Sequence, residues 1–131
     1  MAIEYVYSLS VQDYCRLRES VGFYALTEVQ VLRALDKSDF IVAASVGGSP
    51  VGMARLISDG TQALVMDVIV HPDYQRSGIG RGLMDQIKAY FERQGCPDML
   101  INLLTDSTKT AFYEKLGYHR TEGMRLHVKS D

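Results

Sequence analysis

One stretch of the sequence, DVIVHPDYQRSGIGRGLM from Asp67 to Met84, constrains the fold more than any other. It opens with β-branched residues, which favour a strand, and closes as the start of an amphipathic helix. Between the two, Gly78, Gly80 and Gly82 fall within five positions. Glycine costs roughly 1 kcal/mol relative to alanine inside a helix, so the cluster indicates that something approaches the backbone closely there. Because a helix N-terminus presents unpaired N–H groups and the positive end of a dipole, the expected guest is an anion such as phosphate.

The whole chain has the length and composition of one globular domain. Its 131 residues, of which 47% are hydrophobic and 23% charged, suffice for one core but not for two domains. A formal net charge of −2 provides no general basic surface for nucleic acid or an anionic membrane. The N-terminus has no signal-peptide pattern, and no apolar run is long enough to cross a bilayer. Cys15 and Cys96 lack a CxxC partner, as is typical of reduced thiols, so we expect a single cytoplasmic domain over residues 1–131.

Hydrophobic periodicity predicts both helices and strands along the chain. Strands are expected over residues 3–9, 40–46, 51–57, 63–70 and 99–104, with two short final strands over 118–121 and 124–128. Helices are expected from 11 to about 22, from 28 onward, from the glycine cluster to Gly95, and from about 107 to 116. Ser10 is a candidate cap of the first helix, and the strand over 99–104 is apolar enough to be buried on both faces. This order predicts a mixed α/β or α+β fold with one crossover helix after the fourth strand.

Two familiar phosphate-binding loops do not fit the glycine cluster. The chain has no GxxxxGK[ST] run, which disfavours a nucleoside triphosphatase. A dinucleotide-binding GxGxxG turn follows the first strand, whereas here the third glycine, Gly82, is misplaced and the preceding strand is the fourth. What remains is Gln75-Arg76-x-Gly78-x-Gly80, which follows a Val-x-Pro at residues 70–72.

This signature resembles the acyl-CoA pyrophosphate loop of the GCN5-related N-acetyltransferase (GNAT) superfamily. A second stretch, AFYEKLGYHR from Ala111 to Arg120, is similar to the C-terminal motif of that family, usually written FYxKxGF. The helix and strand between the two motifs also fit the family, and together the motifs cover about half of the chain. The resemblance implies a GNAT-like fold: a central mixed, mostly antiparallel sheet of six to seven strands, flanked by about four helices.

The resemblance also implies a site for acetyl-CoA. The backbone N–H groups of the loop would cradle the pyrophosphate, and the pantetheine arm would pair with the open edge of the fourth strand, where it diverges from the fifth. One strand N–H would then polarise the acetyl carbonyl. Asp106 stands where many relatives have Asn, and it can still accept from the N–H of Thr108 or Lys109. The positions implied for the cofactor are Val68, Ile69, Val70, Gln75, Arg76, Ser77, Gly78, Ile79, Gly80, Arg81, Asp106 and Tyr113.

Acetyl transfer also needs groups that move protons. The resemblance implies Tyr113 as the general acid near the CoA sulfur. Asp67 is a candidate to bind a cationic amine or to relay its proton, and a structural carboxylate with satisfied partners is an equally open interpretation. Strand alternation puts Asp67 on the same face as Val65 and Ile69. In the family the segment that holds Tyr24 and Glu28 often lines the acceptor pocket, and no metal site is expected.

The sequence therefore predicts an acetyl-CoA-dependent N-acetyltransferase that acts on a primary amine by direct attack in a ternary complex. The acceptor is a small-molecule amine or a peptide N-terminus, and no sequence feature chooses between them. The alternative is an acyl-CoA-binding regulatory or scaffold protein of the same fold without turnover; a flavin or nicotinamide enzyme is a third possibility. Members of the family are often dimers, which makes the final strands the expected contact of a homodimer.

Overall fold

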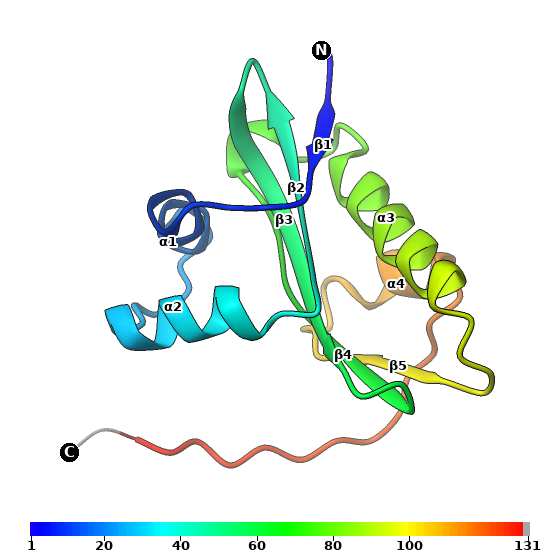
Figure 1. Ribbon diagram of the computed structural model, residues 1–131. Coiled ribbons are helices and arrows are strands. Elements are labelled where there is room, and N and C mark those ends of the chain that lie inside the picture. The colour runs from blue at the N-terminus through cyan, green and yellow to red at the C-terminus, as the bar shows by residue number, and fades with distance from the viewer. Residues whose placement is uncertain (130–131) are drawn as a thin grey trace.

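One mixed sheet forms the centre of the protein in the computed structural model, which describes residues 1–129 (Figure 1). The sheet has five strands, which lie side by side in chain order. They are β1 (Glu4–Val6), β2 (Phe40–Val46), β3 (Ser49–Ser58), β4 (Gln62–Val70) and β5 (Leu100–Leu103). Neighbouring strands pair antiparallel as far as β4, and β5 then pairs parallel to β4. A parallel pair needs a crossover, and α3 (Ile79–Gln94) provides the one that the sequence predicts.

Helices cover both faces of the sheet (Figure 1). The helices α1 (Val11–Ser20) and α2 (Glu28–Lys37) lie on one face, and α3 and α4 (Thr110–Lys115) lie on the other. A short 3₁₀ helix, η1 (Pro72–Tyr74), leads from β4 towards α3. Ser10 caps α1 as predicted, because its side chain accepts a hydrogen bond from the N–H of Asp13 at 3.1 Å. Gly95 ends α3 in the left-handed conformation, with a φ of 64°.

The two helical layers enclose two hydrophobic cores. The larger core lies between the sheet and α3 with α4, and its members include Val42, Ala54, Leu56, Val65, Ile79, Leu83, Ile87 and Tyr113. The smaller core lies under α1 and α2 and consists of Tyr14, Leu17, Val31, Met53 and Ile69. Full burial of each large apolar side chain stabilises the fold by about 1.5–3 kcal/mol, so both layers are held firmly to the sheet.

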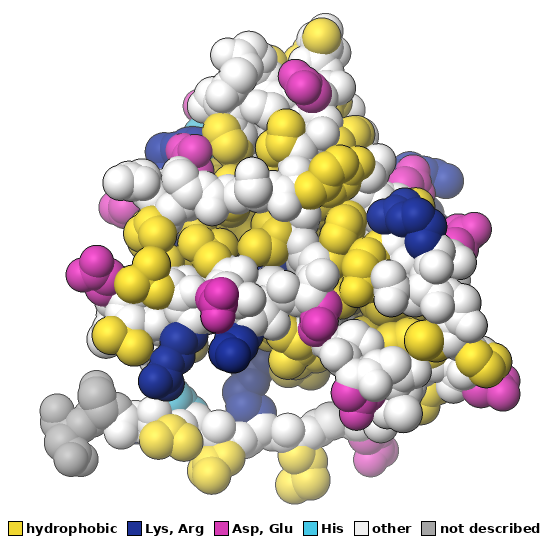
Figure 2. All heavy atoms as spheres, in the orientation of Figure 1, with side chains coloured by type: hydrophobic (Ala, Val, Ile, Leu, Met, Phe, Trp, Pro, Cys, Tyr) yellow, Lys and Arg dark blue, Asp and Glu magenta, His cyan; other side chains and the backbone are white. Residues whose placement is uncertain are grey.

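The end of the chain differs from the prediction. The described residues after α4 form no strand, so the strands expected over 118–121 and 124–128 are wrong, and the sheet has five strands rather than six or seven. Met124, Leu126 and Val128 alternate as in a strand, yet their side chains are almost fully exposed. Figure 1 shows this segment running extended and apart from the sheet, and Figure 2 shows hydrophobic side chains projecting from it at the surface. An alternating pattern predicts a strand only where a partner strand is available, and no described strand pairs with this segment.

Smaller corrections concern the edges of other elements. The first strand covers only Glu4–Val6 rather than residues 3–9, and the fourth helix begins at Thr110 rather than at 107. The hairpin between β2 and β3 turns at Gly47 and Gly48, both with positive φ, so β3 already begins at Ser49. The strand expected to be buried on both faces is the edge strand β5, and its Leu100 is 61% exposed. Among the described strands only β4 pairs with β5, so the other edge of β5 has no partner strand in residues 1–129.

Candidate active site

The strand β4 provides the open edge that the site requires, because it loses its β5 neighbour halfway along. Pairing between the two strands runs from Gln62 with Leu100 to Val65 with Leu103 and ends there. Residues 66–70 remain paired with β3 on one side and with no described strand on the other. Their remaining backbone N–H and C=O groups are therefore available to an extended ligand, as at any sheet edge.

A β-bulge at Asp67 marks the start of this open segment. Met53 pairs with Ile69 but Arg55 pairs with Met66, so β4 holds one more residue than β3 at this point. Asp67 adopts a φ of 52°, in the left-handed region that residues with a Cβ rarely enter. The extra residue also reverses the alternation of β4, since Val65 packs on the α3 side and Ile69 on the α1 side. The prediction that Asp67 shares a face with both Val65 and Ile69 is therefore wrong, because Asp67 lies on the Ile69 side only.

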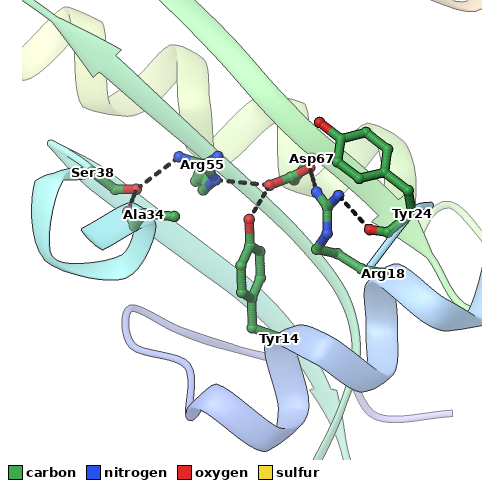
Figure 3. Close-up of polar contacts among 7 residues, drawn as sticks. All are labelled: Tyr14, Arg18, Tyr24, Ala34, Ser38, Arg55 and Asp67. Carbon is green, nitrogen blue, oxygen red and sulfur yellow. Dashed lines mark hydrogen bonds and ion pairs between the residues drawn. The ribbon is translucent and has the colours of Figure 1, made fainter. Parts of the chain in front are cut away.

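The carboxylate of Asp67 accepts three hydrogen bonds, shown in Figure 3. Its Oδ1 accepts from Nη1 of Arg18 at 2.8 Å, and its Oδ2 accepts from Nε of Arg55 at 2.8 Å and from the hydroxyl of Tyr14 at 2.5 Å. The Asp67 side chain is only 8% exposed. Burial, together with the hydrogen bond to Asp67, raises the pKa of the Tyr14 phenol, which therefore acts as a donor. We call Tyr14, Arg18, Arg55 and Asp67 the Asp67 cluster.

Sequence reasoning named Asp67 but missed its three partners. Tyr14 and Arg18 are separated by one helical turn, so they face the same side of α1, and this spacing was the available signal. Their pairing with Asp67 spans about fifty residues, which no local pattern reports. Arg55 follows Ala54 in an apolar strand, where a charged side chain requires a buried partner.

Arg18 connects the Asp67 cluster to the segment between α1 and α2. Its Nη2 donates to the carbonyl oxygen of Tyr24 at 3.1 Å, and its guanidinium lies 5.2 Å from the ring centroid of Phe23 and 5.5 Å from that of Tyr24. Tyr24 is 72% exposed. Glu28, the first residue of α2, is also exposed, so both predicted acceptor residues are accessible at this side of the sheet.

The glycine loop after β4 leaves the start of α3 open. Arg76 and Gly78 both have positive φ, and Gly78 occupies the N-cap position, where it brings no side chain to the first N–H groups of the helix. Gln75 folds back, with its Nε2 donating to the carbonyl oxygen of Val70 at 3.0 Å, and Ser77 donates to the carbonyl oxygen of Tyr74. Arg76 and Arg81 are exposed on either side of the helix start, and the buried Ile79 anchors it. A free helix N-terminus with adjacent arginines suits a phosphate ligand.

The three glycines of the cluster serve different purposes. Gly78 supplies the left-handed turn, with a φ of 84°. A Cβ atom on Gly80 would lie 3.4 Å from the ring of Phe112, so here α3 and α4 approach each other in ordinary contact. Tyr5 occupies the position of a Cβ on Gly82. The absence of a side chain at Gly82 is therefore explained by the packing of Tyr5 from β1 and not by a ligand that approaches the backbone.

Tyr113 lies beside the loop through its place on α4. Its side chain is 8% exposed and packs against the rings of Phe112 and Tyr118, at centroid distances of 5.0 and 6.0 Å. Burial, with smaller contributions from Tyr118 and Asp106, raises the pKa of Tyr113 to about 12. The hydroxyl therefore keeps its proton at neutral pH. Asp106 accepts from the N–H of Thr108 at 2.9 Å, as predicted, although this turn precedes α4 rather than capping it.

Residues 1–129 also contain His, Cys, Asp and Glu side chains outside the candidate site. That part of the chain contains no group of three His, Cys, Asp or Glu side chains arranged to hold a metal ion. Cys15 and Cys96 are free thiols on the surface. None of the described helices has the length and apolar character to cross a membrane.

The match to a known family decides what this arrangement is. Residues 36–120 match the family model described as the acetyltransferase (GNAT) domain. The chain belongs to the GNAT acetyltransferases. The matched residues contain β4, the glycine loop and Tyr113, which are positions that the resemblance implies for the cofactor. They exclude α1 and the segment with Tyr24 and Glu28, which leaves the acceptor half to be argued from this chain alone.

Relatives of known sequence and structure agree with this assignment. The GNAT chain is 35% identical over 103 residues to serotonin N-acetyltransferase 2, chloroplastic, of Oryza sativa subsp. japonica, a match that covers 75% of this chain and 50% of the relative. It is 28% identical over 116 residues to the uncharacterized N-acetyltransferase ycf52 of Pyropia yezoensis, covering 85% of this chain and 66% of that one. The chain thus spans one half to about two thirds of the length of these curated relatives.

Solved structures share the whole fold. A probable acetyltransferase of unknown function from meticillin-resistant Staphylococcus aureus superposes with a TM-score of 0.89 at 26% identity, covering 98% of this chain and all of the other. A GNAT family protein from Streptococcus pneumoniae TIGR4 gives 0.78 at 28% identity, with 98% of each chain covered. The chain therefore has the GNAT fold, the mixed α/β fold that its motifs predicted.

Proposed function

We propose that this GNAT enzyme uses acetyl-CoA to acetylate a primary amine by direct attack in a ternary complex. One arrangement supports the proposal: the open segment of β4 leads into the uncapped start of α3, which lies against α4, the helix that carries Tyr113. The segment leads through the loop into α3, and Gly80 on α3 contacts Phe112, the neighbour of Tyr113. An extended thioester that carries a pyrophosphate has one group for each of these three features.

Acetyl-CoA, the acetyl donor, would bind through these three features. The N–H groups from Gln75 to Arg81 would hold the pyrophosphate, with Arg76 and Arg81 near the ribose phosphate. The pantetheine arm would pair with the free edge at residues 68–70. A backbone N–H of that segment would stabilise the oxyanion that develops on the thioester carbonyl, and such a donor is worth roughly 3–4 kcal/mol.

The reaction then needs one attack and one proton donation. The neutral amine nitrogen attacks the carbonyl carbon, the C–S bond breaks, and the CoA sulfur takes a proton from the hydroxyl of Tyr113. The amine nitrogen loses its extra proton to water on the side of β4 where Tyr24 and Glu28 lie, and water returns a proton to the Tyr113 phenolate. With its raised pKa, Tyr113 is fully protonated when it is needed as the acid.

An arylalkylamine is the acceptor class to be examined first. The rice relative carries serotonin in its name. In this chain, the segment between α1 and α2 exposes Phe23 and Tyr24 beside the Asp67 cluster. Exposed aromatic rings suit an aromatic ligand, which can stack on them. A peptide N-terminus is the other acceptor that the same site would accommodate.

The test is thiol release from acetyl-CoA with a panel of arylalkylamines, polyamines, aminosugars and peptides with free N-termini, with the acetylated product confirmed by mass spectrometry. Turnover on any member, with CoA bound at one site by calorimetry, supports the proposal. CoA binding without turnover on the whole panel would favour the alternative, a regulatory or scaffold protein that kept the cofactor site.

We also propose that the enzyme forms a homodimer and acts in the cytoplasm. The exposed alternating apolar residues of 124–128 and the exposed Leu100 on the edge strand β5 support the dimer, because a second copy would cover them. Fractionation of cells that express the tagged protein tests the location, since one relative is named as chloroplastic.

A further inference from the structure

The Asp67 cluster joins three elements at the point where the candidate cofactor strand opens. Tyr14 and Arg18 come from α1, Arg55 comes from β3, and Asp67 is the bulge residue of β4 (Figure 3). Arg55 also donates from Nη1 to the hydroxyl of Ser38 at 3.4 Å, which extends the cluster to the end of α2. Figure 3 shows the side chains of Tyr14, Arg18 and Arg55 converging on the single carboxylate.

The backbone at Asp67 needs such support. Its positive φ is unfavourable for a residue with a Cβ, and a conformation of this kind persists only where surrounding contacts determine it. Two arginines and a tyrosine hold both carboxylate oxygens, and the side chains of Arg18 and Arg55 are themselves only 11% and 12% exposed. Charge-assisted hydrogen bonds of this kind are directional, so they fix the carboxylate and the backbone that carries it.

The position of the bulge determines the geometry of the residues after it. Pairing with β5 ends at Val65, the bulge lies at Asp67, and the proposed cofactor segment follows at 68–70. An error of about 1 Å in such a segment can reduce turnover roughly 100-fold, because the oxyanion donor then misses its target.

We propose that Tyr14, Arg18 and Arg55 are positioning residues, and that Asp67 holds the bulge of β4 rather than receiving the proton of the amine. This assignment rests on the proposed acetyl transfer. Arg18 has a second task, because its bond to the Tyr24 carbonyl ties the acceptor segment to the strand that would hold the thioester.

The hydrogen bonding of Asp67 argues against proton acceptance. Both oxygens already accept bonds, and two of the three donors carry a full positive charge. Protonation of either oxygen would break an ion pair buried between α1 and the sheet, where the freed arginine has little access to water.

Steady-state kinetics of three variants test the assignment: Asp67→Asn, Arg18→Met and the double variant. Arg18→Met keeps a long apolar stem against Tyr14 and Phe23 but removes the donors. Arg33→Met, at an exposed arginine of α2, is the matched control and should behave as wild type. Each assay is run well below the melting temperature, and kcat is counted per CoA-binding site from a calorimetric titration, so that loss of folded protein does not lower the result.

The positioning role predicts a shared effect. Asp67→Asn and Arg18→Met should each lower kcat by a similar factor, between about 10-fold and 100-fold, and the double variant should be no worse than the more impaired single one. The pH profile of kcat/KM should keep its shape in Asp67→Asn. A base role predicts instead that Asp67→Asn loses 10²–10⁴-fold, far more than Arg18→Met, with loss of the acidic limb of the profile. That result, or unchanged kcat in Arg18→Met, would overturn the assignment.

Failure of the proposed acetyl transfer can be distinguished from failure of the positioning role. If wild-type protein turns over no amine, the proposal of acetyl transfer fails, and CoA affinity then tests the cluster by itself. Weaker CoA binding in both Arg18→Met and Arg55→Lys, with Arg33→Met unchanged, would still support a role in shaping β4, whereas unchanged affinity would refute it. Arg55→Lys keeps the charge and replaces Asp67→Asn if that variant does not fold.

Discussion

The hydroxyl group of Tyr5 fills the position that a Cβ atom on Gly82 would occupy. Tyr5 lies on β1 and packs against the core under α3, and Gly82 lies in the first turns of α3. Burial raises the pKa of the Tyr5 phenol, and the nearby charge of Asp85 adds to this effect. Gly82 therefore lets β1 pack closely against α3. In this way β1 supports the helix whose N-terminus is the candidate phosphate site.

Gly82→Ala should lower the free energy of unfolding by about 1–3 kcal/mol, since the new methyl group must displace the Tyr5 ring. The roughly 1 kcal/mol by which alanine favours a helix interior offsets part of this cost. Urea unfolding measures the change. Gly80→Ala is the matched comparison, because its Cβ would only contact Phe112. Equal stability of Gly82→Ala and wild type would contradict the packing role.

Gly80→Glu should abolish CoA binding. Its side chain would start beside Phe112 and Val70 and place carbon and negative charge at the open start of α3, where the pyrophosphate is proposed to lie. Calorimetric titration with CoA measures the effect, with Gly80→Ala as the control for the added Cβ atom alone. If Gly80→Glu binds CoA with wild-type affinity, the loop is not the phosphate site.

Tyr113→Phe should lower kcat by roughly 100-fold or more while changing CoA affinity little. The substitution keeps the ring that packs against Phe112 and Tyr118 and removes only the proton that the departing thiolate needs. Initial rates of thiol release, alongside calorimetry with CoA, separate the two quantities. An unchanged kcat would remove Tyr113 from the mechanism.

Stability should fall as the pH rises above about 10. The pKa of Tyr113 is raised from 10.0 to about 12 by burial, and burial also raises those of Tyr14 and Tyr118. In the unfolded chain these phenols ionise first, so between the two pKa values the folded state binds more protons and unfolding becomes easier as pH increases. Urea midpoints across this range should drop less steeply in Tyr113→Phe than in wild type.

The start of α3 after the glycine loop and the cap of α1 could be predicted from the sequence, because their signals are local. The glycine loop and the helix cap at Ser10 depend on residues that lie within a few positions of one another. The Asp67 bulge was not predictable, since a period-two pattern contains no sign of an inserted residue. The roles of Arg18 and Arg55 were missed because their partner, Asp67, lies far along the chain from Arg18 and on the next strand from Arg55.

The prediction of two final strands was wrong because a local pattern was present but no partner strand was present in residues 1–129. Their alternation is a real local signal, but a strand forms only when another edge pairs with it, and the sequence does not say which chain supplies that edge. Leu100 and Leu104, on and just after β5, are exposed in the same way as Met124, Leu126 and Val128. The pattern therefore predicts a surface that one copy of the chain leaves uncovered.

The homodimer gives the last prediction. If residues 124–128 of one copy cover the exposed β5 edge of another, removal of residues 124–131 should convert a dimer to a monomer in sedimentation equilibrium, while the fold and its two cores remain. Leu126→Glu should also lower the association constant of the dimer, because a charge would replace an apolar contact between edges. Arg125→Gln alters the neighbouring side chain without touching the apolar set and should leave the association constant near that of wild type. A wild-type protein that stays monomeric at all concentrations, or a truncated protein that stays dimeric, would show that these residues do not form the contact.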